Sequence, residues 1–276
     1  MFLFVLLIAV YSAYDFYIIT ENGVFAEISS QTLNVTNAKN LGIKRPGVLY
    51  CATSGTEISF VNIEIHGNIT ETLYTIDFHG NIKDNKSYSM IGNLAYNKEG
   101  SLYATSFDEV NRNRDIIKIS NNKIKYVFPP YDEGHLLKYD KTTGWYYMMM
   151  DRSFLHEQYV EVIETNNDWW RVLYMISINY GQITDIIPFN KTIYVFVNRN
   201  RKNQLWEISG NDYEKRRVLV EYPKFHGSWN SVLVNKELHT IMYDYGYGRH
   251  WVITDLSTLK YTNKLMQNGL HISCIF

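Results

Sequence analysis

One short pattern recurs along the chain: an apolar run, a polar turn in which Asn or Asp precedes Lys, and a second apolar run. The clearest copy is IGNLAYNKEGSLYATS at 91–106. Asn and Asp followed by polar residues suit a tight reversal of the chain. Successive turns lie 43, 50 and 45 residues apart and begin at Asn97, Asp140, Asn190 and Asn235. This spacing predicts that a hairpin unit repeats with a period in the mid-forties.

Further strand-like runs extend each hairpin to four strands. Predicted third strands, often ending in Ile-Ser, lie at 24–29, 60–65, 116–120, 159–164, 205–209 and 251–257. Predicted fourth strands lie at 73–80, 123–130, 170–177 and 217–227. The 23 tyrosines and the many β-branched residues suit half-buried strands. Units of four antiparallel strands at this period predict an all-β fold, a six-bladed β-propeller. Five or seven blades stay open as alternatives.

The two ends of the propeller are expected to meet in one blade. The strand at 15–20, the Asn22-Gly23 turn and the strand at 24–29 lack an innermost strand. The spare apolar segment 270–276 is predicted to supply it and to close the ring, with Phe276 buried. In the second unit, the innermost strand is expected around 40–44.

The first residues are predicted to be a secretory signal peptide. The apolar run 2–10 is too short to span a bilayer, and small residues follow it. We place cleavage after Ser12, with Ala13 as the alternative, so that 1–12 is the signal peptide and 13–276 a single propeller domain. An apolar first strand is the competing interpretation. Export to the extracellular space would make four sequons glycan acceptors. Their asparagines are Asn34, Asn68, Asn85 and Asn190.

Charge and cysteine content narrow the class of partner. The net charge is −1, which provides no global basic field for nucleic acid, so no nucleic-acid partner is expected. No segment after the first residues is long and apolar enough to cross a membrane, and we expect a soluble monomer. The only cysteines are Cys51 and Cys274. They either form one disulfide in an oxidising compartment or remain two buried thiols.

One hairpin carries a family resemblance. GNLAYNKEGSLYATS resembles the GLAFDxxGNLYVTD hairpin of six-bladed propellers of the NHL, SMP-30/gluconolactonase and YWTD groups. SMP-30-like propellers are calcium- or zinc-dependent lactonases or phosphotriesterases with a metal at the mouth of the central channel. The resemblance implies Asn93, Asp185 and Asn230 as the corresponding metal-binding positions. Ser106 stands where the family usually has Asp.

Arginine and aromatic residues concentrate in the loops between the second and third strands. In a propeller these loops share one face, so the pattern predicts a positive rim with aromatic rings beside it. Arginine pairs with carboxylate, phosphate or sulfate groups, which indicates an anionic small molecule, a glycan or an acidic protein surface as partner. Ordinary loop charge, neutralised by nearby acidic residues, is the alternative. The predicted rim residues are Arg112, Arg114, Arg152, Arg199, Arg201, Arg249, Tyr247, His250 and Trp229.

The sequence therefore favours a secreted, glycosylated propeller that acts by binding at this rim and needs no cofactor. The rival is a Ca- or Zn-dependent lactonase or esterase-type hydrolase with its site at the central channel. A structural extracellular protein without a small-molecule site is the third possibility. None of the motifs HExxH, GxSxG or CxxC occurs, so no catalytic residue is assigned.

Overall fold

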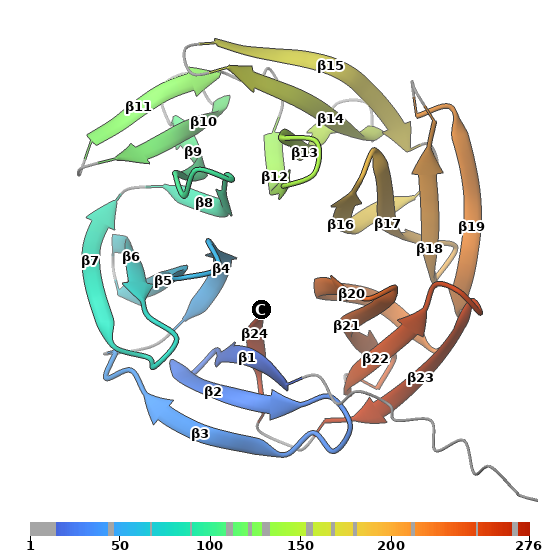
Figure 1. Cartoon of the computed structure of the whole chain (residues 1–276), viewed down its shortest axis with the longest axis horizontal. Coiled ribbons are helices and arrows are strands. Elements are labelled where there is room, and N and C mark those ends of the chain that lie inside the picture. Colours follow the sequence, from blue (N-terminus) through green and yellow to red (C-terminus); the bar gives the residue numbers. More distant parts are fainter. Residues whose placement is uncertain are drawn as a thin grey trace, which may run out of the picture.

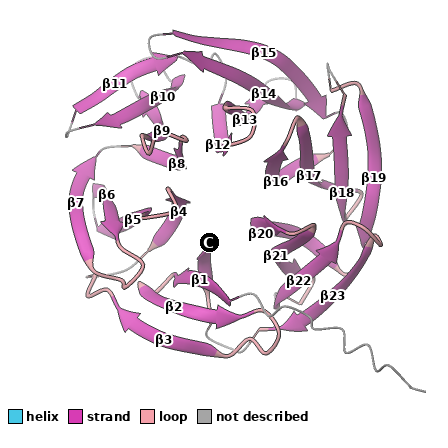
Figure 2. Ribbon diagram, viewed as in Figure 1, coloured by secondary structure: helices cyan, strands magenta, loops and turns pink. Residues whose placement is uncertain are grey.

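The computed structural model describes residues 15–43, 47–66, 68–88, 90–108, 113–120, 123–128, 133–152, 157–166, 169–178, 181–210, 213–246, 248–266 and 270–276. Within these ranges, 24 strands form six antiparallel sheets of four strands, which stand as blades around a central axis (Figure 1). The described residues contain strands and loops but no helix (Figure 2), so no helix among them could span a bilayer. The predicted all-β, six-bladed propeller is confirmed.

Of the first three blades, each written from the axis outwards, only blade 1 takes strands from both ends of the chain. Blade 1 contains β24 (Ile272–Ile275), β1 (Asp15–Thr20), β2 (Val24–Ser29) and β3 (Val35–Asn40). Blade 2 contains β4 (Val48–Thr53), β5 (Ile58–His66), β6 (Asn68–Ile76) and β7 (Ile82–Tyr88). Blade 3 contains β8 (Ile91–Tyr96), β9 (Leu102–Asp108), β10 (Asn113–Ser120) and β11 (Lys123–Phe128).

The last three blades follow one another along the chain without exchange. Blade 4 contains β12 (Glu133–Asp140), β13 (Trp145–Arg152), β14 (Glu157–Asn166) and β15 (Trp169–Ile178). Blade 5 contains β16 (Gln182–Phe189), β17 (Thr192–Arg199), β18 (Lys202–Ser209) and β19 (Lys215–Tyr222). Blade 6 contains β20 (Phe225–Val234), β21 (Glu237–Asp244), β22 (Arg249–Asp255) and β23 (Lys260–Leu265).

The C-terminal strand closes the ring as the sequence predicts. β24 pairs antiparallel with β1, with Ile19 opposite Cys274, and the chain ends beside the axis (Figure 1). Phe276 is half-buried rather than buried, and it packs against the cluster between blades 1 and 2. Closure matters because it pairs the backbone groups that an open edge strand would expose.

Blade 2 corrects the sequence-based assignment by one strand. The predicted inner strand at 40–44 is wrong, because the inner strand is β4. The run at 60–65 lies in β5, the second strand from the axis, and the run at 73–80 overlaps the second half of β6, the third strand. The missed strands are three outermost ones, β3, β7 and β23, whose residues are mostly exposed. An outer strand packs little apolar surface, so it lacks the alternation that marks a strand in sequence.

The tight turns use the residues that their backbone conformation requires. Asn190-Lys191 and Asn235-Lys236 both have two consecutive positive φ values, at 48° and 60° and at 48° and 68°. Two-residue turns of this kind match the twist of paired strands, and Asn tolerates the left-handed region better than most residues. Asn200-Arg201 forms a third such turn, between β17 and β18.

The core is divided into six apolar clusters, one at each junction between neighbouring blades. The Met148–Met150 run shows how a strand serves two of them. Met149 packs towards blade 5, whereas Met148 and Met150 pack towards blade 3. Alternate side chains of a strand point to opposite faces of its sheet, so each blade contributes to the core on both of its faces.

Candidate functional site

Each innermost strand carries a β-bulge, at which two residues of that strand lie opposite a single residue of the neighbouring strand. The extra residues include His135 in β12, Thr184 in β16 and Asn230 in β20, with further bulges in β4, β8 and β24. A bulge redirects side chains locally and increases strand twist. Repeated around the axis, the bulges turn polar side chains towards the centre of the ring.

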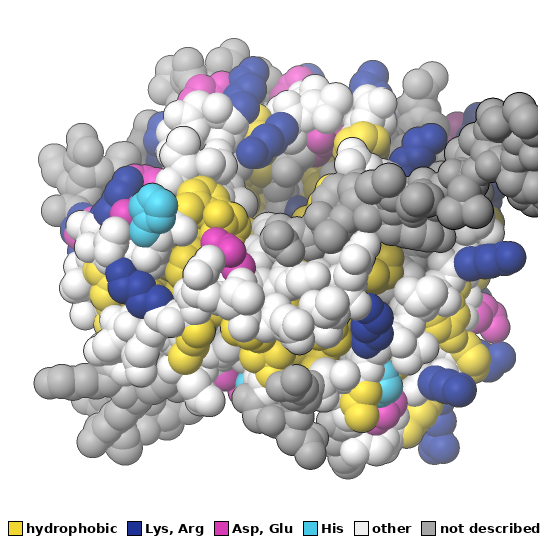
Figure 3. Space-filling model, turned by 60° about the horizontal axis from the view of Figure 1, so that its bottom comes forward, with side chains coloured by type: hydrophobic (Ala, Val, Ile, Leu, Met, Phe, Trp, Pro, Cys, Tyr) yellow, Lys and Arg dark blue, Asp and Glu magenta, His cyan; other side chains and the backbone are white. Residues whose placement is uncertain are grey.

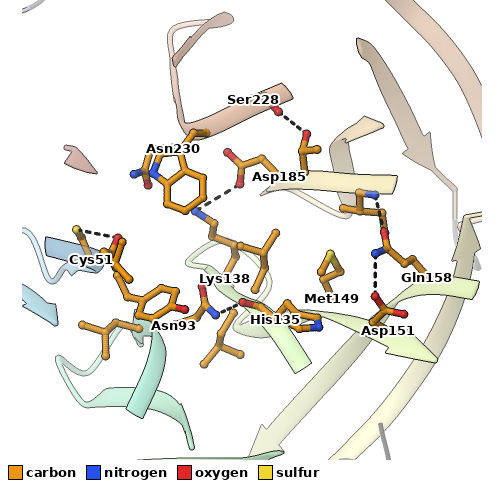
Figure 4. A pocket seen from close by; sticks show the side chains of 18 of the residues that line it. Cys51, Asn93, His135, Lys138, Met149, Asp151, Gln158, Asp185, Ser228 and Asn230 are labelled. Carbon is orange, nitrogen blue, oxygen red and sulfur yellow. Dashed lines mark hydrogen bonds and ion pairs between the residues drawn. The ribbon is translucent and has the colours of Figure 1, made fainter. Parts of the chain in front are cut away.

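These side chains line a cavity of about 440 Å³ at the axis, which we call the axial pocket (Figure 4). Its lining comes mainly from the first halves of the inner strands of blades 2 to 6 and from the adjoining ends of β13 and β14. It therefore opens on the face that carries the loops between second and third strands, here called the entry face. The polar lining residues are Asn93, His135, Lys138, Asp151, Gln158, Gln182, Thr184, Asp185, Ser228 and Asn230.

Hydrogen bonds join the inner strands of adjacent blades around the pocket. The Asn93 amide N–H donates to the backbone carbonyl of His135, across blades 3 and 4 (Figure 4). The Asn230 amide N–H donates to the carbonyl of Ser273, which ties blade 6 to the closing strand. The hydroxyls of Thr184 and Ser228 lie 2.6 Å apart, between blades 5 and 6. The bulged residues thus help to fix the shape of the cavity.

Lys138 and Asp185 form the charged centre of the pocket (Figure 4). The Lys138 Nζ atom lies 3.7 Å from Asp185 Oδ1, and the side chains are 30% and 3% exposed. The Asp185 carboxylate also accepts the backbone N–H groups of Ile186 at 2.9 Å and Ser231 at 2.8 Å. A buried charge needs such partners. Lys138 also lines a neighbouring cavity of about 170 Å³, so its side chain borders both.

A second polar chain supports the wall of blade 4. Gln158 donates its amide N–H to Asp151 Oδ2 at 3.1 Å and accepts the backbone N–H of Ile183 at 2.6 Å (Figure 4). The chain links the end of β13 to the start of β16. Lys138, Asp151 and Gln158 are separated in sequence and share no motif, so no sequence pattern predicts that they lie together.

The three positions implied by the family resemblance lie together. Asn93, Asp185 and Asn230 all line the axial pocket, although they come from blades 3, 5 and 6. Each already has a partner: the two asparagine amides donate to carbonyls, and the aspartate faces Lys138. Among the described residues, no group of three or more His, Cys, Asp or Glu side chains is placed to hold a metal ion.

The predicted arginine rim is described only in part. Arg112 and Tyr247 lie outside the described residues, and only the strand positions of Arg114 and Arg152 are described. Arg201 is exposed in the β17–β18 turn, and Arg199 is partly exposed at the end of β17. On the side shown in Figure 3, Lys and Arg side chains are spread singly among neutral and acidic residues.

Blade 6 uses its rim residues for internal contacts. Arg249 pairs with Glu21 at 2.9 Å, is 20% exposed, and lies 5.3 Å from the ring centre of Tyr243. The His250 Nε2 atom lies 3.0 Å from Asp244 Oδ2, and this contact lowers the pKa of Asp244. Trp229 is 39% exposed and borders the axial pocket, where its indole N–H donates to the Ser273 carbonyl at 3.3 Å.

The remaining predicted positions concern covalent modification. Asn34, Asn85 and Asn190 are exposed, and the side chain of Asn68 lies outside the described part. Cys51 in β4 and Cys274 in β24 form a disulfide with a Cα–Cα distance of 6.1 Å. It joins the inner strands of blades 2 and 1 across 223 residues of sequence.

Comparison with known proteins identifies the fold and nothing finer. No family model and no curated protein matches the chain. Solved structures do: TolB from Acinetobacter baumannii matches with a TM-score of 0.67 and 13% identity, over 95% of this chain and 65% of that chain. The chain thus spans slightly less than two thirds of the TolB chain.

Two other solved structures give the same result. The Cps50 (Swd1) β-propeller domain of Myceliophteria thermophila matches with a TM-score of 0.60 and 10% identity, over 93% of this chain and 83% of that one. A mutant of Synechocystis apocarotenoid oxygenase matches with a TM-score of 0.55 and 10% identity, over 95% and 72%. These proteins include an oxygenase, so the likeness does not separate binding proteins from enzymes. At such identities it shows that the chain has a β-propeller fold.

Proposed function

We propose that this chain is a binding protein that holds a small polar organic ligand in the axial pocket. The main support is that polar side chains from several blades converge on one cavity of about 440 Å³. Ligand sites typically occupy about 300–1,000 Å³ and combine an apolar wall with a few placed polar groups. Leu94, Met149 and Trp229 supply apolar wall here, and amides and hydroxyls supply hydrogen bonds.

The charges of the pocket favour a ligand that is neutral or positively charged. Its lining contains one ammonium group, Lys138, and two carboxylates, Asp151 and Asp185. With His135 neutral, the lining therefore carries a net charge of −1. An anionic small molecule, a glycan or an acidic protein would instead meet Arg199 and Arg201 at the edge of the entry face. Binding of such an anionic partner at the rim is the alternative that the unfolding experiment below also tests.

A metal-dependent hydrolase receives less support from the same residues. A calcium or zinc ion bound by Asp185 would have to replace the Lys138 ammonium, which already neutralises that carboxylate. It would also need additional charged ligands, and among the described residues no group of three or more His, Cys, Asp or Glu side chains is placed to hold a metal ion. The donor set thus favours an organic ligand, and metal ions are included in the test as the competing outcome.

The proposed role is extracellular. The apolar run at 2–10, the exposed asparagines Asn34, Asn85 and Asn190, and a cysteine pair all suit an exported glycoprotein. Expression in cultured eukaryotic cells tests this directly. Export predicts recovery from the medium, an N-terminus near Ala13, and a loss of mass on treatment with an N-glycosidase. Retention of the full-length, unmodified chain inside the cells would refute it.

The binding proposal is tested by thermal unfolding with defined probes. The probes are myo-inositol, glutamine and putrescine for the pocket, a heparin disaccharide for the rim, and CaCl₂ or ZnCl₂ after EDTA. At ten times its Kd, a ligand stabilises the native state by about 1.4 kcal/mol, which raises the midpoint of a chain of this size by about 2–3 °C. We expect such a saturable rise with at least one pocket probe.

A matched pair of variants locates the binding. Gln182 and Lys215 are the first residues of β16 and β19 in the same blade, and both are exposed. Gln182→Trp places a large side chain in the axial pocket, whereas Lys215→Trp adds the same bulk on the outer strand. The shift should disappear only in Gln182→Trp. An equal shift in both variants, no shift with any pocket probe, or a shift with metal alone would contradict the proposal.

A further inference from the structure

A second cavity lies between blades 3 and 4, on the face opposite to the entry face. It has a volume of about 340 Å³, and we call it the blade 3–4 groove. One wall is the β8–β9 turn at 97–101, and the other is formed by the β12–β13 turn and the adjoining ends of β14 and β15. No residue of the groove lines the axial pocket.

Aromatic rings form the apolar part of the groove. Tyr103 and Trp170 have ring centroids 5.3 Å apart, inclined at 59°. Tyr146 packs beneath both of them, at 5.3 Å from Tyr103 and 4.9 Å from Trp170, and Tyr139 lies 4.8 Å from Tyr146. The rings hold one another in place from two different blades, so the surface that they offer is largely preformed.

The Tyr103 and Tyr139 hydroxyls and the Glu99 carboxylate supply polar groups to the groove. Burial and the nearby Glu99 carboxylate raise the pKa values of the Tyr103, Tyr139 and Tyr146 hydroxyls, which therefore stay protonated. The Tyr146 hydroxyl is fully buried and has no hydrogen-bond partner among the described residues. Tyr146 does not line the groove, so its ring supports the groove wall and its hydroxyl offers no contact to a ligand there.

The charges of the groove balance. Lys98 and Lys118 lie on the blade 3 side together with Glu99, and Glu164 lies on the blade 4 side. Glu164 pairs with Arg171 at 2.7 Å, and Lys98 lies 3.7 Å from Glu99. The Lys118 ammonium already lies 5.8 Å from the centre of the Tyr103 ring. A cationic ligand would compete with that lysine for the ring, so the groove favours a neutral ligand.

We propose that the blade 3–4 groove binds a saccharide, with a sugar ring against Trp170 and Tyr103. The sugar hydroxyls would bond to Glu99, Lys98 and the hydroxyls of Tyr103 and Tyr139, which all line the groove. A pyranose has an apolar face of C–H groups and a rim of hydroxyls that both donate and accept. Neutral rings with this double character match a surface of preformed aromatic rings surrounded by charged and hydroxyl groups. The site is separate from the axial pocket and does not depend on its function.

The sequence supplies an internal control for the test. Asn-Lys-Glu occurs at the blade 3 turn, 97–99, and again at the blade 6 turn, 235–237. The double variant Lys98→Ala/Glu99→Ala removes two groups of the groove. The double variant Lys236→Ala/Glu237→Ala makes the same change on another blade. Neither pair belongs to the core, since Lys98, Glu99 and Lys236 are exposed and Glu237 is partly exposed.

The measurement uses saturation-transfer NMR and tryptophan fluorescence on the whole chain. The probes are cellobiose, maltose, lactose and N,N′-diacetylchitobiose, with choline as the cationic comparison. We expect at least one disaccharide to bind the wild type, the Lys236→Ala/Glu237→Ala variant and Gln182→Trp with similar affinity. Binding to Lys98→Ala/Glu99→Ala should be at least tenfold weaker. Absence of binding by all four disaccharides, binding of choline instead, or equal affinity for both double variants would overturn the proposal.

Discussion

Removal of the Cys51–Cys274 disulfide is the perturbation whose effect follows most directly from the structure. The bridge joins β4 of blade 2 to the closing strand β24, so it fixes the strand that closes the ring to the neighbouring blade. Cys274 is fully buried beside Ile19 and Phe60 in the cluster between blades 1 and 2. We therefore choose Cys51→Ser with Cys274→Ala, which places no hydroxyl at the buried position.

The size of the effect follows from the loop that the bridge closes. The cysteines are 223 residues apart, and the chain-entropy relation then gives about 18 cal/mol/K, or about 5 kcal/mol at 25 °C. Measured effects usually fall below this limit, so we expect a loss of about 3–5 kcal/mol. With an unfolding entropy of about 2.1 cal/mol/K per residue, the midpoint should fall by about 5–9 °C.

Calorimetry and urea unfolding of the same samples test this reasoning. Reduced wild type is the control, because it keeps both sulfur atoms but lacks the bond, and it should unfold close to the double variant. The urea m-value should rise when the bridge is absent, since the unfolded chain becomes more extended. If oxidised wild type, reduced wild type and the variant unfold within about 1 °C of one another, the bridge does not constrain the unfolded chain as argued.

Three further predictions concern blade 6 and its contact with the closing strand. Burial lowers the pKa of His239 to about 4 in the folded chain. The unfolded chain therefore binds a proton at a higher pH than the folded chain does, and stability should be lost as the pH falls from 6.5 to 4. The loss at pH 5 should be about 2 kcal/mol relative to pH 7.5, and His239→Gln should remove it in urea titrations at each pH. Asn230→Ala deletes the tie to Ser273 and should cost about 1–2 kcal/mol, whereas unchanged unfolding would show the tie to be dispensable. Glu21→Gln leaves the mostly buried Arg249 without its ion-pair partner and should destabilise the chain more than Glu21→Gln combined with Arg249→Gln, as a double-mutant cycle would measure.

The repeat and the turn chemistry are local properties, so both can be recognised in the amino-acid sequence, and they predict the six-bladed architecture. Apolar alternation in the inner strands recurs along the chain, and Asn-Lys or Asp-Lys pairs mark the first reversal of blades 3 to 6. Together they predict six four-stranded units closed by the last segment. Blade 2 was misassigned because β3 and β7 are outer strands, and exposed residues leave no periodic apolar signal. The strand order there was decided by pairing between strands, which no single window of sequence contains.

The candidate sites depend on positions that only the closed ring brings together. Asn93, Asp185 and Asn230 were named from a resemblance, but their neighbours Lys138, Asp151 and Gln158 carry no motif and meet them only at the axis. The blade 3–4 groove likewise joins Tyr103 to Trp170, which are far apart in sequence. Local sequence determined which strands and turns form, because those follow from backbone preference and burial. Tertiary structure decided which polar side chains share a cavity, because the bulges and the closure of six blades set their directions and distances.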